Sequence, residues 1–429
     1  MDFYPETFGA LGDGRTDDGR ALQEAINACC ACGGGRVILR SGRIYLSHSL
    51  MLRSRVELHL ENGSTLRASG ELESYFRPDQ PERDGNASKV GTPVTGKPSY
   101  VFLYGLGCHH LCVSGQGTID GNGYAFVRRV SPYYVTGDFY PRPTLCYLEN
   151  CQHVTVRDVT MCRVPFWTLH LGGCRDVLLD SLRILNPLDV ANSDGIDVDH
   201  SQYVRIRSCH VECADDCICM KNTLGNHEYE PTSHVIVEGC TLISTSAALK
   251  IGTEGVDDFS NITFAHCMID RSNRGISIQV RDAGQVRNVH FQDIMIHTRR
   301  FAENWWGCGE AIAVTAFDRD GSVPGGGIEH ILFRDIVCEG ENGVFLAGMP
   351  GRIRDVRMEG VRVRLERTSR WPLDRYDLRP GAGTGIMERK TVPFLSMGAD
   401  VRLLDVILED ENGRMCRPVM EAESPTLNL

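Results

Sequence analysis

The sequence lacks the features that mark a membrane protein or a nucleic-acid-binding protein. None of its apolar runs reaches the roughly 18 to 20 residues that a membrane-spanning helix needs. Basic residues are also outnumbered, because 45 Lys+Arg against 56 Asp+Glu give a net charge of −11. An acidic chain is a poor electrostatic match for nucleic acid or an anionic membrane surface. We therefore expect neither nucleic acid nor a membrane among its partners. The sequence does not distinguish a monomer from an oligomer.

A secretory leader and a recognisable disulfide framework are lacking too. The first residues contain no basic segment followed by an apolar stretch. Eighteen cysteines are present, but several are adjacent or nearly so, as at 29–30 and 217–219. We interpret them as thiols that are buried like small hydrophobic side chains, in a cytoplasmic protein. The alternative is a secreted protein whose leader is not part of this sequence.

What is present is a nine-residue pattern of alternating apolar residues that recurs along the chain. Its copies include 153–161, 203–211, 234–242, 261–269, 288–296, 330–338 and 355–363. The first apolar position falls at Val154, Val177, Val204, Val235, Ile262 and Val289, in steps of 23, 27, 31, 27 and 27 residues. This period is typical of a solenoid and too short for a strand–helix–strand crossover. It predicts an all-β fold, a single-stranded right-handed parallel β-helix in which each repeat is one coil.

We predict a single domain with three regions. A capping region at 8–35 contains an amphipathic helix over 17–31, coils follow over 36–409, and a polar tail occupies 410–429. Four long loops, at 74–99, 124–142, 298–322 and 368–392, interrupt the coils and are expected to line a substrate cleft. One apolar column of the repeat holds Cys209, Cys240 and Cys267 where other copies have valine or isoleucine, which indicates a core position and not a metal site.

Carboxylates are concentrated in two short segments that depart from the repeat. The first is Asn-Ser-Asp-Gly-Ile-Asp at 192–197, and the second contains Asp215 and Asp216. Asp194 and Asp215 are 21 residues apart, close to one coil, so stacked coils are expected to bring Asp194 beside the Asp215–Asp216 pair. Repulsion between carboxylates separates their pKa values, and glycoside hydrolysis needs one protonated and one ionised carboxyl group. The competing interpretation is a set of turn residues or calcium ligands.

These segments resemble a known family. The residues at 192–197, followed after one coil by Asp-Asp-Cys-Ile at 215–218, are similar to the signature of the polygalacturonase-type glycoside hydrolases of family 28. The opening at 8–18 and the segment 164–170 are also similar to pectin-active β-helix proteins. The resemblance implies an inverting hydrolase without a metal or other cofactor, in which Asp215 is the general acid and Asp194 and Asp216 deprotonate the attacking water. It further implies that Asn192 orients this group and that Asp197 holds the turn.

The sequence departs from the family where a uronate would be bound. Ala247 stands at the position of a family histidine, and the family's Arg-Ile-Lys aligns with Ser277-Ile-Gln279. Because a carboxylate is held by charge-assisted bonds, losing both cations argues against ordinary polygalacturonase activity. We therefore expect rhamnose or another neutral sugar in the cleft. Lys250, Arg274 and Arg281 lie on neighbouring coils and either replace the missing charges or are solvated surface residues.

Further substrate contacts are expected from aromatic residues and one histidine. Trp305 and Trp306 are adjacent in a long loop, where they could stack on a sugar ring. His170 either polarises a sugar hydroxyl or sits in a hydrogen-bonded turn.

The sequence thus predicts a glycosidase that acts on pectin-derived or related plant oligosaccharides and cleaves them from the chain end. One alternative is a polysaccharide lyase on the same fold, for which the acidic clusters would bind calcium. A second is a carbohydrate-binding β-helix that has lost catalysis, which the changes at Ala247, Ser277 and Gln279 keep open.

Overall fold

The computed structural model describes residues 1–72, 75–78, 96–127, 142–303, 305–321, 323–383 and 385–425. The chain divides into two compact units, which we describe separately. Unit 1 comprises Met1–Ala214 and Glu228–Glu230, and unit 2 comprises Asp215–His227 and Pro231–Leu429. The organisation as a single domain stays a prediction. None of the helices among the described residues has the length and apolar composition of a membrane-spanning segment.

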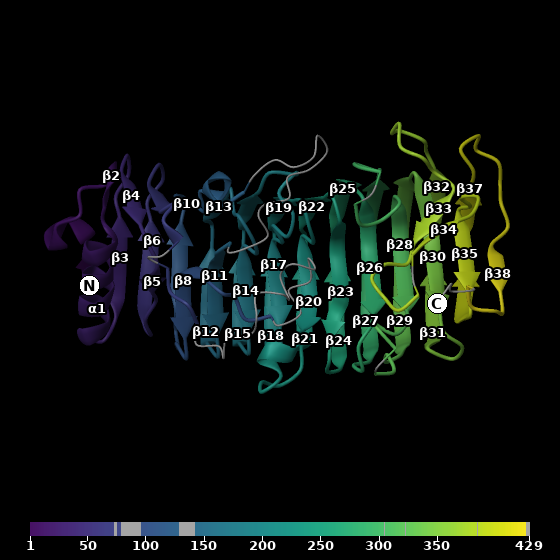
Figure 1. Ribbon diagram of the computed structural model, residues 1–429, viewed down its shortest axis with the longest axis horizontal. Coiled ribbons are helices and arrows are strands. Elements are labelled where there is room, and N and C mark those ends of the chain that lie inside the picture. Colours follow the sequence, from purple (N-terminus) through teal and green to yellow (C-terminus); the bar gives the residue numbers. More distant parts are fainter. Residues whose placement is uncertain are drawn as a thin grey trace. The chain divides into compact units, whose positions relative to one another are not determined.

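Unit 1 begins with the expected amphipathic helix. Helix α1 (Gly19–Ala31) starts two residues later than predicted and buries Ala21, Leu22, Ala25, Ile26 and Cys29. It packs against β1 (Asp2–Phe3) and β3 (Gly35–Leu39) of the first coil, at the purple end of the ribbon in Figure 1. The Asp18 carboxylate accepts hydrogen bonds from the backbone N–H groups of Leu11 and Gly12, which fixes the entry into the helix.

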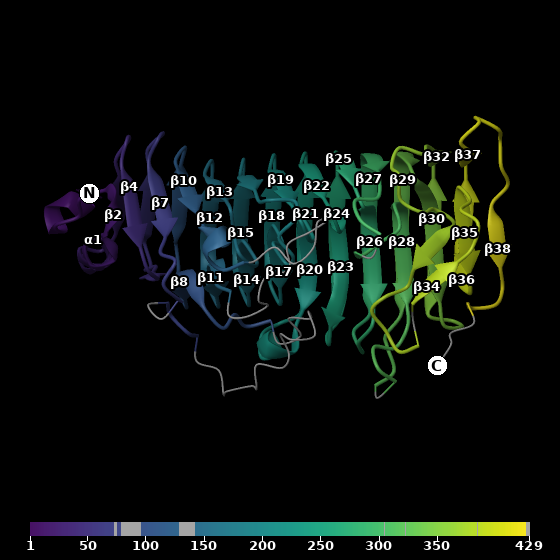
Figure 2. The ribbon, with the colours of Figure 1, turned by 45° about the horizontal axis from the view of Figure 1, so that its top comes forward.

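Three parallel sheets make up the rest of unit 1, and both views show their strands side by side (Figures 1 and 2). The first contains β1 (Asp2–Phe3), β3 (Gly35–Leu39), β6 (Val56–Leu60), β9 (Cys112–Gly115), β12 (Gln152–Arg157), β15 (Arg175–Asp180) and β18 (Gln202–Arg207). The second contains β2 (Asp13–Asp17), β4 (Ile44–Ser47), β7 (Thr65–Ala68), β10 (Thr118–Asp120), β13 (Thr160–Cys162), β16 (Arg183–Leu185) and β19 (His210–Cys213). The third contains β5 (Leu50–Met51), β8 (Val101–Leu106), β11 (Thr144–Glu149), β14 (Leu169–Gly172) and β17 (Ile196–Asp199). Among the described residues, unit 1 also contains the 3₁₀ turns η1 (Pro5–Phe8) and η3 (Gly123–Ala125).

Unit 2 repeats this three-sheet arrangement. Its first sheet contains β21 (Ser233–Glu238), β24 (Phe259–Ala265), β27 (Val286–Thr298), β29 (Ile328–Gly340), β31 (Ile353–Glu359) and β36 (Ala399–Leu404). The second contains β22 (Thr241–Ser244), β25 (Met268–Ser272), the later halves of β27 and β29, β32 (Arg362–Leu365) and β37 (Ile407–Glu409). The third contains β20 (Ile218–Asn222), β23 (Ala247–Gly255), β26 (Arg274–Val280), β28 (Glu310–Ala316), β30 (Asn342–Gly348), β35 (Phe394–Met397) and β38 (Val419–Glu421). The turn η4 (Leu224–Asn226) and the antiparallel hairpin of β33 (Arg375–Asp377) and β34 (Ile386–Glu388) lie between coils.

The predicted fold class, a right-handed parallel β-helix, is confirmed, and within each unit the register follows the repeat. Val154 pairs with Val177, which pairs with Val204, and in unit 2 Val235, Ile262 and Val289 continue in the same way. The strands of the first two sheets end at Glu409 with β37, and the predicted boundaries of the three regions stay predictions. The segment 410–429, expected to be only a polar tail, contributes β38, which pairs with β35.

The residue before each first apolar position adopts a left-handed backbone conformation. His153, Asp176, Tyr203, His234, Asn261, Asn288, His330 and Asp355 all have φ between 46° and 57°. Asparagine, aspartate and histidine are the non-glycine residues found most often in this conformation, because a short polar side chain can bond locally. This requirement explains why most copies of the repeat begin with one of these residues.

The inward side chains form apolar columns in each unit. Cys240 and Cys267 in unit 2 and Cys209 in unit 1 are buried, as expected for core positions. The rings of Phe264, Phe291 and Phe333 stack on successive coils with centroids 4.8 and 4.9 Å apart. This spacing is that of neighbouring β-strands, so identical side chains on successive coils meet directly.

Candidate active site

Two carboxyl groups lie directly before strand β20 in unit 2. Asp215 and Asp216 expose only 6% and 1% of their surface. Asp216 Oδ2 lies 2.8 Å from Lys250 Nζ, and Asp216 Oδ1 accepts a hydrogen bond from the Ser246 hydroxyl at 3.3 Å. The Asp215 backbone carbonyl accepts a hydrogen bond from the Ser244 hydroxyl. The carboxylate of Asp216 is therefore anchored by a cation within its own unit.

Lys250 reaches Asp216 because of the alternation along β23. Its neighbours Leu249 and Ile251 are fully buried in the core, so Lys250 points to the opposite side of the strand. Its side chain is only 12% exposed, so Lys250 is not a solvated surface residue. Its ammonium group has the Asp216 carboxylate as counter-charge. Burial opposes its ionisation, but Asp216 outweighs this effect and the pKa of Lys250 is raised.

The two neighbouring carboxyl groups differ in their electrostatic surroundings. Burial, together with the charge of Asp216, raises the pKa of Asp215 to about 7, while Lys250 and Lys221 oppose this rise. Near neutral pH, Asp215 can therefore hold a proton while Asp216 is stabilised as an anion by the Lys250 ammonium. A proton donor and an ionised carboxylate side by side can perform general acid/base chemistry.

A second buried ion pair lies on the same two strands. Lys221 on β20 donates to Glu254 Oε2 on β23 at 3.0 Å. Arg319 pairs with Asp282 and also approaches Glu254 Oε1 at 4.0 Å. Sequence reasoning missed Lys221. Residues two apart on a strand share a face, so Lys221 lies on the same face as Cys219, which pairs with Lys250.

The other predicted acidic segment belongs to unit 1. Asp194 is buried, and its backbone carbonyl accepts a hydrogen bond from the Thr168 N–H at 2.9 Å. Asn192 has a left-handed backbone, and its Oδ1 accepts a hydrogen bond from Arg142 Nη2 at 2.9 Å. Arg142 also donates to the backbone carbonyls of Pro165 and Ala191, which holds the segment in place. Sequence reasoning missed Arg142 because the stretch 124–142 carries no copy of the repeat.

His170 and Asp197 occupy paired positions on β14 and β17 of unit 1. His170 is fully buried in a strand and not in a turn, and its Nε2 lies 3.1 Å from Asp199 Oδ2. Burial opposes ionisation of Asp199, but hydrogen bonds from His170 and His200 lower its pKa well below the usual range. Asp197 is also fully buried. The contact of His170 with a sugar hydroxyl and the part of Asp197 in holding the turn both stay predictions.

Arg281, Trp305 and Trp306 meet a segment of unit 2 that we call the strap, residues 375–380. Arg281 is fully buried, and its guanidinium donates to the backbone carbonyls of Thr315, Leu378 and Pro380. Through these hydrogen bonds, Arg281 fixes the strap to the third sheet of unit 2. Its predicted contact with substrate stays a prediction. In the strap, Arg379 lies 5.1 Å from the ring centroid of Trp306 and donates to the Trp305 carbonyl at 2.9 Å. Both tryptophans are half-buried.

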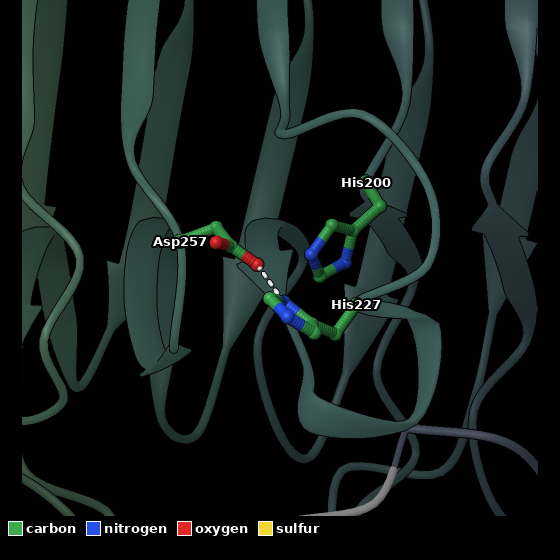
Figure 3. A group of neighbouring side chains, drawn as sticks. All are labelled: His200, His227 and Asp257. Atoms are coloured by element: carbon green, nitrogen blue, oxygen red, sulfur yellow. Dashed lines mark hydrogen bonds and ion pairs between the residues drawn. The ribbon is translucent and has the colours of Figure 1, made fainter.

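Another polar pair of unit 2 follows β20. His227 Nδ1 and Asp257 Oδ2 are 2.6 Å apart, and the dashed line in Figure 3 marks this contact. The His227 side chain is largely exposed, so the pair is expected to add little to stability.

The structure thus brings Asp215, Asp216 and Lys250 together within unit 2. Asp194 belongs to unit 1, and its position beside them stays a prediction from the sequence spacing.

Comparison with known proteins places this architecture among characterised families. The model of the glycosyl hydrolases family 28 matches residues 84–300, just over half of the chain. A probable polygalacturonase from Vitis vinifera is 26% identical over 309 residues, which cover 69% of this chain but only 60% of that protein. This chain therefore spans about three fifths of the length of that relative.

Solved structures share the fold over nearly the whole chain. The family 28 exopolygalacturonase from Yersinia enterocolitica has a TM-score of 0.71 at 16% identity, covering 99% of this chain and 79% of that one. A hyperthermoactive exopolygalacturonase from Thermotoga maritima has a TM-score of 0.67 at 20% identity, covering 99% of this chain and 93% of that one.

Proposed function

Because this chain belongs to the glycosyl hydrolases of family 28, we propose that it hydrolyses O-glycosidic bonds in pectin-derived or related plant oligosaccharides. Asp215 donates its proton to the glycosidic oxygen as the bond to the sugar breaks. Asp216, together with Asp194, accepts the proton of the attacking water, which enters from the opposite face of the sugar with inversion. The observation that carries this proposal is the ion pair that holds the Asp216 carboxylate next to Asp215, whose pKa is raised to about 7.

The part given to Asp194 rests on the sequence. It precedes Asp215 by 21 residues, which is close to the length of one coil. Within unit 1, residues one coil apart pair directly, as His170 does with Asp197. The same rule predicts that Asp194 stands beside the Asp215–Asp216 pair.

We further propose a neutral or deoxy sugar, such as rhamnose, at the cleaved bond. Ala247, Ser277 and Gln279 supply no cation where the family has histidine, arginine and lysine. The nearby cations do not replace that charge, because Lys250 is paired with Asp216 and Arg274 with Glu310. A uronate carboxylate would therefore find no counter-charge among these described residues and would lose its hydration on binding.

Cleavage from the chain end is supported by the strap. On the outer side of the third sheet of unit 2, Ser277 is followed in register by Ala313, Phe345 and Leu395. Tyr376 and Leu378 of the strap pack on this apolar row in one buried cluster. An oligosaccharide lying along this side would meet the strap, so we propose that it can enter only with one end.

Product analysis on a panel of pectic and rhamnose-containing oligosaccharides tests the proposal. We expect release of single neutral sugars from the chain end, with the inverted anomer detected first by NMR. The matched controls are Asp215→Asn and Asp194→Asn, which keep side-chain shape and should abolish hydrolysis. An unsaturated product that depends on calcium would instead identify a lyase, and sugar binding without turnover would identify a binding protein. The cytoplasmic location stays a prediction.

A further inference from the structure

The ion pair between Lys221 and Glu254 takes no part in the reaction as described, yet it is deeply buried. Their side chains are 3% and 7% exposed, and Nζ and Oε2 are 3.0 Å apart. Taking two charges out of water is costly, and replacing such a pair with apolar residues is often neutral or stabilising. Stability alone is therefore a weak explanation for this pair.

The position of the pair relates it to the acid/base group. Lys221 follows Asp216 by five residues and lies on β20, and Glu254 follows Lys250 by four residues and lies on β23. The two strands pair in parallel, with Cys219 opposite Lys250. Asp216, two residues before β20, thus pairs with Lys250 of β23, and Lys221 of β20 pairs with Glu254 of β23.

Glu254 is fixed in place and stays ionised. Its Oε1 accepts a hydrogen bond from the Thr253 hydroxyl at 2.9 Å and is approached by Arg319. Burial opposes ionisation of Glu254, but Lys221 and Arg319 outweigh this effect and lower its pKa to about 2. Glu254 therefore fixes the position of the Lys221 ammonium group and offsets part of its charge.

We propose that Lys221, held by Glu254, is a positioning residue that tunes how firmly Asp215 retains its proton during catalysis. This inference rests on the proposed function. The groups that act on Asp215 are the carboxylate of Asp216, the ammonium groups of Lys250 and Lys221, and, by the proposal above, Asp194. Lys221 favours the anion that Asp215 becomes when its proton moves to the leaving oxygen, and Glu254 limits that effect.

The pH dependence of kcat and kcat/KM in the full-length protein tests this inference. Lys221→Met removes a cation, so the alkaline limb should move to higher pH by about one unit. Glu254→Gln leaves the Lys221 charge without its partner, so the same limb should move to lower pH by a similar amount. The double variant should return close to the wild-type profile, and Lys221→Arg should keep it.

The matched control is Glu359→Gln, which breaks the exposed Arg334–Glu359 pair of β29 and β31 and should leave the profile unchanged. A uniform loss of kcat without movement of the limb, or movement of both single variants in one direction, would overturn the inference. Titration of Asp215 by NMR of ¹³C-labelled aspartate, assigned with Asp215→Asn, gives a readout without substrate. Opposite shifts in that titration, with no hydrolysis by the wild type, would refute the proposed function alone.

Discussion

The ammonium nitrogen of Lys250 lies 2.8 Å from Asp216 Oδ2, and both side chains are almost fully screened from solvent. This contact gives one of two adjacent, buried carboxyl groups a counter-charge. Under the proposed function, the same contact also occupies the charge of Lys250 that a uronate would otherwise need, so this ion pair would bear on both the acid/base chemistry and the choice of sugar.

Removing the Lys250 charge is expected to impair hydrolysis. In Lys250→Met, the buried carboxylate of Asp216 loses its counter-charge and the contact that holds it in place, so it becomes a poorer acceptor for the proton of the attacking water. We expect kcat to fall by roughly 10²-fold, the lower part of the range for general acid/base groups. Lys250→Arg is the control and should retain much of the activity. Full activity of Lys250→Met, measured as sugar release at pH 7, would contradict this role.

The raised pKa of Asp215 predicts an effect of pH on stability. Because the folded pKa of about 7 exceeds the ordinary value of 3.8, the folded protein binds the proton more tightly than the unfolded chain. This contribution to stability is complete below about pH 4 and is lost as pH rises towards 7, by roughly 4 kcal/mol at most.

Asp215→Asn should remove that pH dependence. Its free energy of unfolding, from urea titrations, should exceed that of the wild type at pH 8 and approach it at pH 4. The same titration predicts that hydrolysis by the wild type declines above about pH 7, since the acid is then ionised. A difference between the two proteins that stays constant from pH 4 to pH 8 would be inconsistent with a protonated Asp215.

Loosening the strap is expected to change the mode of cleavage. Leu378 packs on Phe345 and Leu395, so Leu378→Ala leaves a cavity and weakens the contact by about 2 to 5 kcal/mol. We expect longer products from polymeric substrates, measured by chromatography of early digests. Val337→Ala changes an exposed apolar residue on β29 and serves as the control. Unchanged release of single sugars by a folded Leu378→Ala protein would argue against the strap as the end stop.

The left-handed position that opens each repeat can be tested at Asn288, where φ is 55°. Valine is strained in this conformation, so Asn288→Val should destabilise unit 2 by about 1 to 3 kcal/mol. Asn288→Gly should cost much less, because glycine adopts positive φ freely. Thermal unfolding of both variants measures the difference, and equal melting temperatures would show that the conformation is not required.

Much of the fold was predictable because the same pattern of apolar residues recurs in many copies along the chain. Each copy carries the same alternation, so the pairing of Val154 with Val177, or of Val235 with Ile262, follows from aligning the copies. Burial of Cys240 and Cys267 followed from the same alignment. Strand β38 was not predictable, because 410–429 carries no copy of the repeat and its pairing depends on β35 being exposed to it.

The candidate site was only partly predictable for a related reason. The chain itself determined the coils, the helix α1 and the adjacent carboxyl groups of Asp215 and Asp216, because these depend on local alternation and on neighbours in sequence. Tertiary structure alone decided that Lys250 forms an ion pair with Asp216 and that Lys221 forms one with Glu254. It also decided that Arg281 donates hydrogen bonds to the strap. Long charged side chains pair with whichever partner packing brings within about 3 Å, and no periodicity encodes that distance.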